Sequence, residues 1–465
     1  TELKTDLLRL KRKLEMAQST PAVTPDSKPG QAKRADRSIA VLYFENLSGV
    51  KEDEYLRDGI TEDILTDLSK IKGLNVFPRT TVLAYRDQKA TAAQICQQLR
   101  ADFALEGSLR RAGNRLRINA QLIDAATGFP AWSERYDREM SDIFEVQDEI
   151  AHKIAEALRI TLTPQEQAAL AAKPTENLQA YDLYLRGRSY ARRNTRQDME
   201  FALQMFENAV ILDANFAMAY AAIANGCAQA HYWTGLDASW IDRAQSASLR
   251  AVALAPEVPE VLLSQAWILY SRGAHEDALR FTRAAIARNR ECEGAYYLLV
   301  RALFAAGSYQ LVAEVAEEAL AAAGSDYNVY IPILNAMSAL GKLDAARNVR
   351  LRLIQALENH IREVPEDARA RILLASAYAE ESRPEEAVRE ASLAMILRPN
   401  EPTVLYNAAC TFCFLGRKSD ALDALRKAWN AGYQDAEWTR RDPDLQPLHG
   451  DPEFERLYPE KPAGA

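Results

Sequence analysis

One sequence pattern recurs about every 34 residues through the C-terminal part of this chain, from Asn177 to Trp429. Its clearest unit spaces small and aromatic residues at helical intervals and ends on Pro399, and the next unit repeats the template directly afterwards. The marker positions of these two units are Ala370, Leu374, Ala375, Tyr378, Ala387, Ala391 and Ala394, then Val404, Ala408, Ala409, Phe412, Gly416, Ala421, Leu425 and Ala428. Such repetition predicts stacked helical hairpins, which build an extended binding surface rather than a reaction centre.

The length and residue pattern of the unit resemble those of tetratricopeptide repeats. About seven units follow one another, and two depart from the template. The second has an insertion around His231–Trp240. In the fifth, Pro332 predicts a first helix that begins late, and the second helix is expected to run to about Ile361. Residues 442–445 and 451–454 resemble the cap that such arrays need to cover their last apolar face.

Charge and composition argue against several classes of protein. A net charge of -8 and a pI near 5.5 do not favour nucleic acid as a partner. The 465 residues include only five cysteines, and no apolar stretch of about 18 residues occurs, so neither a disulfide framework nor a membrane span is expected. We therefore expect a reducing, cytoplasmic compartment. The first residues include no initiator Met and no apolar signal core, so we expect the chain to be part of a longer protein.

Changes in composition divide the chain into five segments, and the fold class expected for the whole is α+β. Residues 1–16 have the leucine spacing of an amphipathic helix, and residues 17–37 have the Ser, Thr and Pro content of a linker. Residues 38–163 alternate strand-like and helix-like runs, which predicts a small mixed α/β domain. Residues 164–431 are expected to form an all-α superhelix of repeats, and residues 432–465 its cap.

The spacing of apolar residues divides the α/β segment into elements. Short continuous apolar runs predict buried strands, whereas strict alternation predicts strands with one buried face. The turn Arg111–Asn114 is expected to join two of these strands as a hairpin. The strands are expected at 39–44, 74–78, 103–109, 116–122 and 132–136, and the helices at 56–71, 91–101 and 143–158.

Several stretches of this segment resemble the TolB amino-terminal-like domain. They are Ser38–Gly49, Asp58–Asp63, Leu105–Arg115, Gln121–Gly128, Trp132–Arg138 and Asp142–Ile150. Tyr43 stands where the family usually has Pro, a departure that changes no chemistry we can name. The resemblance implies a bacterial module that precedes tetratricopeptide repeats and follows a kinase, a cyclase or a DNA-binding output domain. It implies no known ligand.

The first residues, Thr1–Arg12, resemble the last helix of bacterial Ser/Thr protein kinases that carry such C-terminal arrays. A generic basic amphipathic helix, or the start of a coiled coil, explains the same pattern equally well. No kinase glycine loop, catalytic Asp loop or Asp-Phe-Gly motif follows in the sequence. Any kinase chemistry is therefore expected upstream of this chain.

The groove of the array is the expected functional site, because the first helix of each repeat lines its concave face. Aromatic residues and Arg, which are enriched at binding hot spots, occur at the positions expected to point inward. Packing between helices is the alternative explanation for each of them. The candidate partner-binding residues are Trp267, Tyr270, Tyr297, Arg301, Phe304, Asn335, Tyr406, Asn407 and Phe414.

Three groups of reactive side chains have simpler structural explanations. Cys410 and Cys413 have the spacing of half a zinc site, but no second pair accompanies them. The carboxylates of Asp58, Glu62 and Asp63 are attributed to the favourable interaction of acidic residues with a helix N-terminus. A solvated hairpin tip explains Arg110, Arg111, Arg115 and Arg117. We therefore assign no catalytic, cofactor-binding or metal-binding residue and expect no cofactor.

The sequence as a whole favours a non-catalytic interaction and regulatory region of a bacterial signalling protein. Its groove is expected to recruit a protein or peptide segment with apolar anchors and to act on a linked Ser/Thr kinase. The alternative is a small-molecule receptor, in which the α/β domain binds a ligand and the repeats transmit the signal or oligomerise. A homo-oligomer stays open under both hypotheses.

Overall fold

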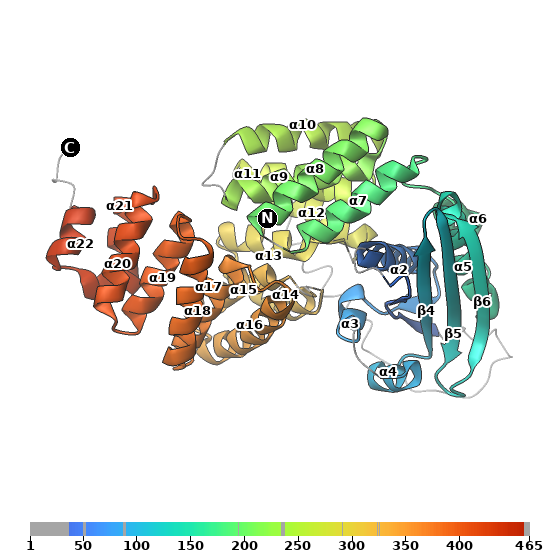
Figure 1. The fold of residues 1–465 in the computed structure, drawn as a ribbon, viewed down its shortest axis with the longest axis horizontal. Helices are drawn as coiled ribbons and strands as arrows, with labels where there is room; N and C mark the ends of the chain where they lie inside the picture. Colours follow the sequence, from blue (N-terminus) through green and yellow to red (C-terminus); the bar gives the residue numbers. More distant parts are fainter. Residues whose placement is uncertain are drawn as a thin grey trace, which may run out of the picture. The chain divides into compact units, whose positions relative to one another are not determined.

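The computed structural model describes residues 37–49, 53–86, 90–193, 195–233, 238–290, 292–322, 324 and 326–459. The predicted N-terminal helix and all of the predicted linker except Arg37 lie outside these residues. The described part is mainly helical, with a small mixed sheet near its N-terminal end (Figure 1). Each helix within it is too short or too polar to cross a membrane.

The sheet combines a parallel part and an antiparallel part in the order β3-β1-β4-β5-β6. Strand β1 pairs in parallel with β3 and β4, and the short strand β2 also pairs in parallel with β4. Strands β4, β5 and β6 form an antiparallel meander. The bounds are β1 Arg37–Val41, β2 Glu45–Asn46, β3 Leu74–Val76, β4 Phe103–Ala112, β5 Arg115–Asp124 and β6 Pro130–Glu139.

The antiparallel strands have one apolar and one polar face, because successive side chains point to opposite sides. The apolar face contributes Leu105, Leu109, Ile118 and Leu122 to the core, each at most 1% exposed. Helices α2 and α5 contact each other on the core side, and α5 contacts β6, whereas α4 contacts β4 and β5. The helix bounds are α2 Glu54–Ser69, α3 Arg79–Leu83, α4 Ala92–Leu99 and α5 Ile143–Ala157.

Local sequence signals explain where several of these elements begin and end. Helix α4 begins with a capping box, in which Thr91 and Gln94 exchange side-chain and backbone hydrogen bonds. The β4–β5 hairpin turns at Gly113, whose φ of 61° favours glycine. The predicted strands and helices of this segment are confirmed to within a few residues, whereas β2 and α3 were not predicted.

After α6 (Pro164–Leu170), the chain folds into consecutive helical hairpins (Figure 1). The first helices of successive hairpins contact one another from α7 to α15 and again between α17 and α19, so they form a row. We call this surface the first-helix row. The hairpins are α7 Leu178–Ala191 with α8 Arg196–Leu212, α9 Ala217–Trp233 with α10 Ala238–Leu254, α11 Pro259–Ser271 with α12 His275–Arg288, α13 Ala295–Ala305 with α14 Tyr309–Ala322, α15 Tyr330–Ala339 with α16 Leu343–Glu363, α17 Ala368–Glu380 with α18 Pro384–Leu397, and α19 Pro402–Phe414 with α20 Lys418–Asn430.

Small residues at the template positions allow the paired helices to approach closely. A Cβ atom added to Gly187 of α7 would lie 2.4 Å from the ring of Phe206 in α8, so only glycine fits there. In the fifth hairpin, Pro332 lies in the first turn of α15, and α16 continues to Glu363. Both irregularities predicted for this hairpin are therefore confirmed.

The end of the array is covered by three short helices, α21 Ala436–Arg441, η4 Pro443–Leu448 and α22 Pro452–Leu457. Helix η4 contacts α19, and α22 contacts α20. The side chains of Leu445, Leu448, Phe454 and Tyr458 are fully buried. They cover the apolar face of the last hairpin, as an array end requires.

Candidate functional site

The structure brings four of the predicted groove residues together on α11 and α13. The Arg301 guanidinium donates hydrogen bonds to the hydroxyls of Tyr270 (3.0 Å) and Tyr297 (2.7 Å). The Trp267 ring lies with its centroid 5.9 Å from each tyrosine ring. Arg301, Tyr270 and Tyr297 are half-buried, so this cluster is partly available at the surface of the first-helix row.

For Trp267 and Tyr406 the structure favours the packing alternative. Trp267 is 1% exposed and Tyr406 is 5% exposed. The Tyr406 hydroxyl donates a hydrogen bond to Asp442 of the cap (2.5 Å), and its ring stacks on Tyr433. Tyr406 is covered because the cap lies against α19, which the residue spacing within the helix does not reveal.

The remaining predicted residues lie on three different helices of the row. Phe304 on α13 is half-buried, with its ring centroid 5.2 Å from that of Tyr309. Asn335 on α15 and Asn407 on α19 are exposed, and Phe414 at the end of α19 is 58% exposed. The structure does not bring these side chains into one cluster. They mark an extended surface from α13 to α19.

A buried ionic junction joins the α/β domain to the array. Glu62 of α2 is 3% exposed, and its carboxylate accepts hydrogen bonds from three arginines. Arg79 of α3 donates at 2.7 Å, Arg188 of α7 at 3.0 Å, and Arg192 through two nitrogens at 2.9 and 2.6 Å. The Tyr43 hydroxyl donates a further bond at 2.9 Å. We call this group the Glu62 junction.

The charge of Glu62 is maintained by its partners. Burial opposes ionisation of the carboxyl group, but Arg192, Arg79 and Arg188 outweigh it and hold the pKa of Glu62 well below its usual range. Arg192 also pairs with Glu293, which precedes α13, at 2.8 Å. These charged groups pair with one another, so the junction holds segments of the chain together.

Further contacts extend the junction along α2 and α3. The Tyr181 hydroxyl of α7 donates to Asp63, and a Cβ atom added to Gly59 would lie 2.7 Å from Leu185. On the other side, the Thr80 hydroxyl donates to the Ala321 carbonyl at the end of α14 (2.9 Å). A cavity of about 250 Å³ lies between α2, α3 and the first helices α7 to α13. The α/β domain therefore faces the N-terminal part of the first-helix row.

The explanation expected for Asp58, Glu62 and Asp63 is wrong. Helix α2 begins at Glu54, so these residues lie beyond its first turn, where the interaction with the helix N-terminus has fallen off. Glu62 and Asp63 have partners on α7 that lie far away in the sequence, and Arg188 is 126 residues from Glu62. Asp58 pairs with the neighbouring Arg57 and with Arg86. Two arginines four residues apart on a first helix, Arg188 and Arg192, were the available signal for a buried acidic partner.

Cys410 and Cys413 do not belong to one group of possible metal ligands in the described residues. Both are buried, and it is Cys410 whose sulfur lies 3.8 Å from the Asp442 carboxylate. Within the described residues, Cys410, Asp442 and Asp444 bring possible metal-ligand atoms within 4.8 Å of one another, and Cys413 is not among them. Burial raises the pKa of Cys410, which opposes the thiolate form that metal binding requires.

Comparison with known proteins finds a family model that matches the α/β segment and a curated protein with a similar sequence. Residues 35–153 match the family model described as the second domain of HilA/YgeH-like transcriptional regulators. The curated protein named putative adenylate cyclase 3 from Rhizobium meliloti (strain 1021) is 44% identical over 190 residues. This match covers 41% of the chain and spans about a third, 32%, of the relative's length.

Solved structures similar to the chain include a tetratricopeptide repeat protein and a TolB protein. TTC0263, a tetratricopeptide repeat protein from Thermus thermophilus, is 20% identical, with a TM-score of 0.34; the match covers 41% of this chain and 99% of that protein. TolB from Acinetobacter baumannii is 18% identical, with a TM-score of 0.21, and covers 28% of this chain and 29% of that protein.

Proposed function

We propose that this chain is a non-catalytic interaction and regulatory region of a bacterial signalling protein. In this proposal the first-helix row binds a protein or peptide segment, and the binding is relayed to a separate output domain. The name of the curated relative and the description of the family model support an output such as a cyclase or a DNA-binding domain. The resemblance of the α/β segment to the TolB amino-terminal-like domain adds a Ser/Thr kinase to these candidates.

The observation that carries the proposal is the division of the first-helix row into two parts. The α/β domain faces the part from α7 to α13, where Arg188, Arg192 and Tyr297 line the cavity between them. The part from α15 to α19 keeps Asn335 and Asn407 exposed. We therefore place the partner on this second part, with Phe414 of α19 and, at the border with the first part, Phe304 of α13 as its apolar contacts.

Site-specific photo-crosslinking tests this placement in the intact protein. A benzophenone amino acid at Asn335 or at Asn407 should crosslink to the same partner. The matched control is Leu249, which is 63% exposed on α10, a second helix of the second hairpin. Equal crosslinking from Leu249, or none from either asparagine, would contradict the proposal.

The output domain is tested separately by the coding sequence immediately upstream of Thr1. A kinase, cyclase or DNA-binding domain in the same reading frame would support a regulatory role for the chain. A start codon close to Thr1 would contradict the link to an output domain and leave the chain as an adaptor.

A second function, reception of a small molecule by the α/β domain, is favoured by one specific observation. A cavity of about 410 Å³ lies beside the sheet, and Tyr43 forms part of its wall. The hydroxyl of the same residue donates a hydrogen bond to Glu62 in the junction with the array. A ligand that moved Tyr43 would therefore act directly on the contact between the two parts.

A further inference from the structure

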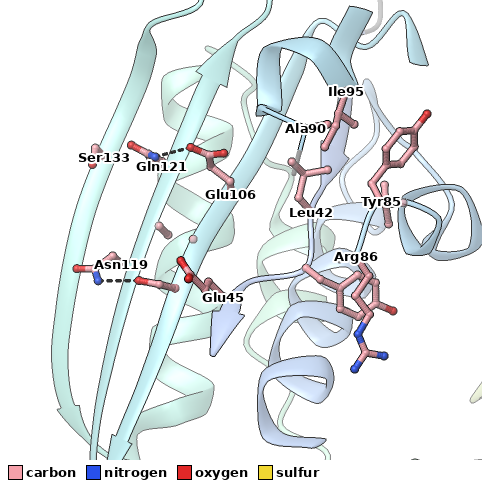
Figure 2. Close-up of a pocket in the computed structure, with 15 residues that line it drawn as sticks. Leu42, Glu45, Tyr85, Arg86, Ala90, Ile95, Glu106, Asn119, Gln121 and Ser133 are labelled. Atoms are coloured by element: carbon pink, nitrogen blue, oxygen red, sulfur yellow. Dashed lines mark hydrogen bonds between the residues drawn. The ribbon is translucent and has the colours of Figure 1, made fainter. Parts of the chain in front are cut away.

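The cavity of the α/β domain lies between the polar face of the sheet and the segments that carry α3 and α4. Figure 2 shows Glu106 and Gln121 on the strands, opposite Leu42, Ala90 and Ile95 on the facing segments. The volume of about 410 Å³ is large enough for a small organic molecule. The cavity lies next to the carboxyl end of β1, which pairs in parallel with β4, and ligands often bind at such strand ends in open α/β sheets.

The strand side of this cavity is polar and fixed by hydrogen bonds. The Gln121 amide donates to a Glu106 carboxylate oxygen (2.5 Å), and the Asn119 amide donates to the Ser108 hydroxyl (2.9 Å). These side chains come from β4 and β5, so the strand pairing holds them in place. A carboxylate accepts more hydrogen bonds than the one that Gln121 supplies.

The opposite side is apolar and aromatic. Leu42, Val82 and Ile95 are buried there, and the rings of Tyr43 and Tyr85 add to the same wall. A polar wall opposite an apolar wall fits a flat molecule with a hydrogen-bonding group on one side.

The charges of the cavity do not balance. Glu45 and Glu106 both line it, and among the described residues neither carboxylate has a basic side chain within ion-pair distance. The one guanidinium in the wall, Arg86, pairs with Asp58 at 2.9 Å and with Glu54 at 3.8 Å, and these two carboxylates lie outside the cavity. The half-buried Glu106 therefore keeps a negative charge that no cation of the wall offsets, and the exposed Glu45 adds a second one.

We infer that this cavity binds a small organic cation, with an amine or amidine group at Glu106 and Glu45 and a flat apolar body against the tyrosine wall. A cationic group would offset the cost of keeping a carboxylate half-buried beside the sheet. Aromatic faces also attract cations, so Tyr85 favours the same class of ligand, whereas the Tyr43 ring already has the Arg86 guanidinium 5.5 Å from its centroid. This inference rests on the second proposed function, reception of a small molecule by the α/β domain, and names its ligand class.

Three probes of nearly the same shape test the charge preference on the whole chain. Benzylammonium, benzyl alcohol and benzoate share one ring and differ in charge, and saturation-transfer NMR at millimolar concentration measures the binding of each. We expect benzylammonium to bind about tenfold more tightly than benzyl alcohol, equivalent to about 1.4 kcal/mol, and benzoate to bind least. Equal binding of the three probes, or binding of none, would overturn the inference.

Matched variants locate the effect. Glu106→Gln should abolish the preference for benzylammonium, whereas Glu156→Gln, an exposed carboxylate of α5 whose side chain is 75% exposed, should leave it unchanged. A preference that survives in a Glu45→Gln, Glu106→Gln double variant would also overturn the inference. Crosslinking from Asn335 in the same variants tests partner binding by the first-helix row separately. Failure of cation binding in the cavity therefore does not imply failure of partner binding, and the reverse also holds.

Discussion

Replacement of Glu62 by Gln is the most direct test of the junction between the α/β domain and the array. Glutamine keeps the size of the side chain and one acceptor oxygen but removes the negative charge that three arginines share. The side chain of Glu62 is 4% exposed, and those of Arg79, Arg188 and Arg192 are 18%, 21% and 19% exposed. Loss of one member from such a group leaves buried charges uncompensated.

The expected loss can be estimated from these exposures. Removal of one partner from a fully buried ion pair costs about 3–5 kcal/mol of unfolding free energy. Each arginine keeps some contact with water and Arg192 retains Glu293, so we expect the lower end of this range, about 3 kcal/mol. Urea unfolding should show this loss of unfolding free energy. The tryptophan fluorescence of the array and the proteolysis of the α/β domain should be followed separately, because two connected parts need not unfold together.

The pH dependence of the same comparison gives an independent check. The pKa of Glu62 is lower in the folded protein than in the unfolded chain, so its contribution is complete above the unfolded value of about 4.3 and is lost as the pH falls through the folded value. The difference between wild type and Glu62→Gln should stay constant from about pH 7 to about pH 5 and shrink below about pH 4.

The control is Glu156→Gln, because Glu156 is exposed on α5 and pairs only with the exposed Lys153. Its effect should stay within about 0.5 kcal/mol. A loss below about 1 kcal/mol for Glu62→Gln, or an equal loss for the control, would refute the reasoning that the junction is a buried ionic contact.

Four further substitutions separate packing from surface positions, each measured by thermal or urea unfolding. Trp267→Ala should cost about 3–5 kcal/mol because the side chain is 1% exposed, whereas Phe414→Ala, at 58% exposure, should cost under about 1 kcal/mol; equal effects would contradict the assignment of Trp267 to the core. Gly187→Ala should cost about 1–3 kcal/mol because its Cβ would lie 2.4 Å from Phe206, and an unchanged midpoint would contradict that contact. Tyr406→Phe should cost about 1–3 kcal/mol because it removes the hydroxyl that donates to the buried carboxylate of Asp442 in the cap, and a neutral result would show that water replaces the hydroxyl.

The hairpins could be predicted because a repeated unit carries its own spacing signal. The apolar and small residues of α17 to α20 recur with the helical period, and each pair buries its face against its neighbour. The strands of the α/β domain were predictable for a similar reason, since alternation along β4 and β5 reveals one buried face. Helix α3 was missed because it has five residues and only one of them, Val82, is buried.

The site was less predictable than the fold. An aromatic residue on a first helix lies either in the core or at the surface. Buried and surface aromatic residues can be one helical turn apart, so their spacing does not distinguish them. Trp267 and Tyr270, three residues apart on α11, illustrate this, since the first is buried and the second half-buried. The Glu62 junction depends on contacts between segments more than a hundred residues apart, which spacing within one element cannot reveal.

The ion pairs at the end of α7 differ in strength, and the difference decides which contact governs the junction. Arg192 pairs with Glu62 in the α/β domain and with Glu293 before α13, while the adjacent Arg193 pairs with Glu366 before α17. The side chains of Glu293 and Glu366 are 50% and 46% exposed, so each of these pairs contributes about 0–1 kcal/mol and weakens as salt screens it. The pair with Glu62 is shielded from solvent and is screened far less. High salt should therefore weaken the pairs with Glu293 and Glu366 before it weakens the Glu62 junction.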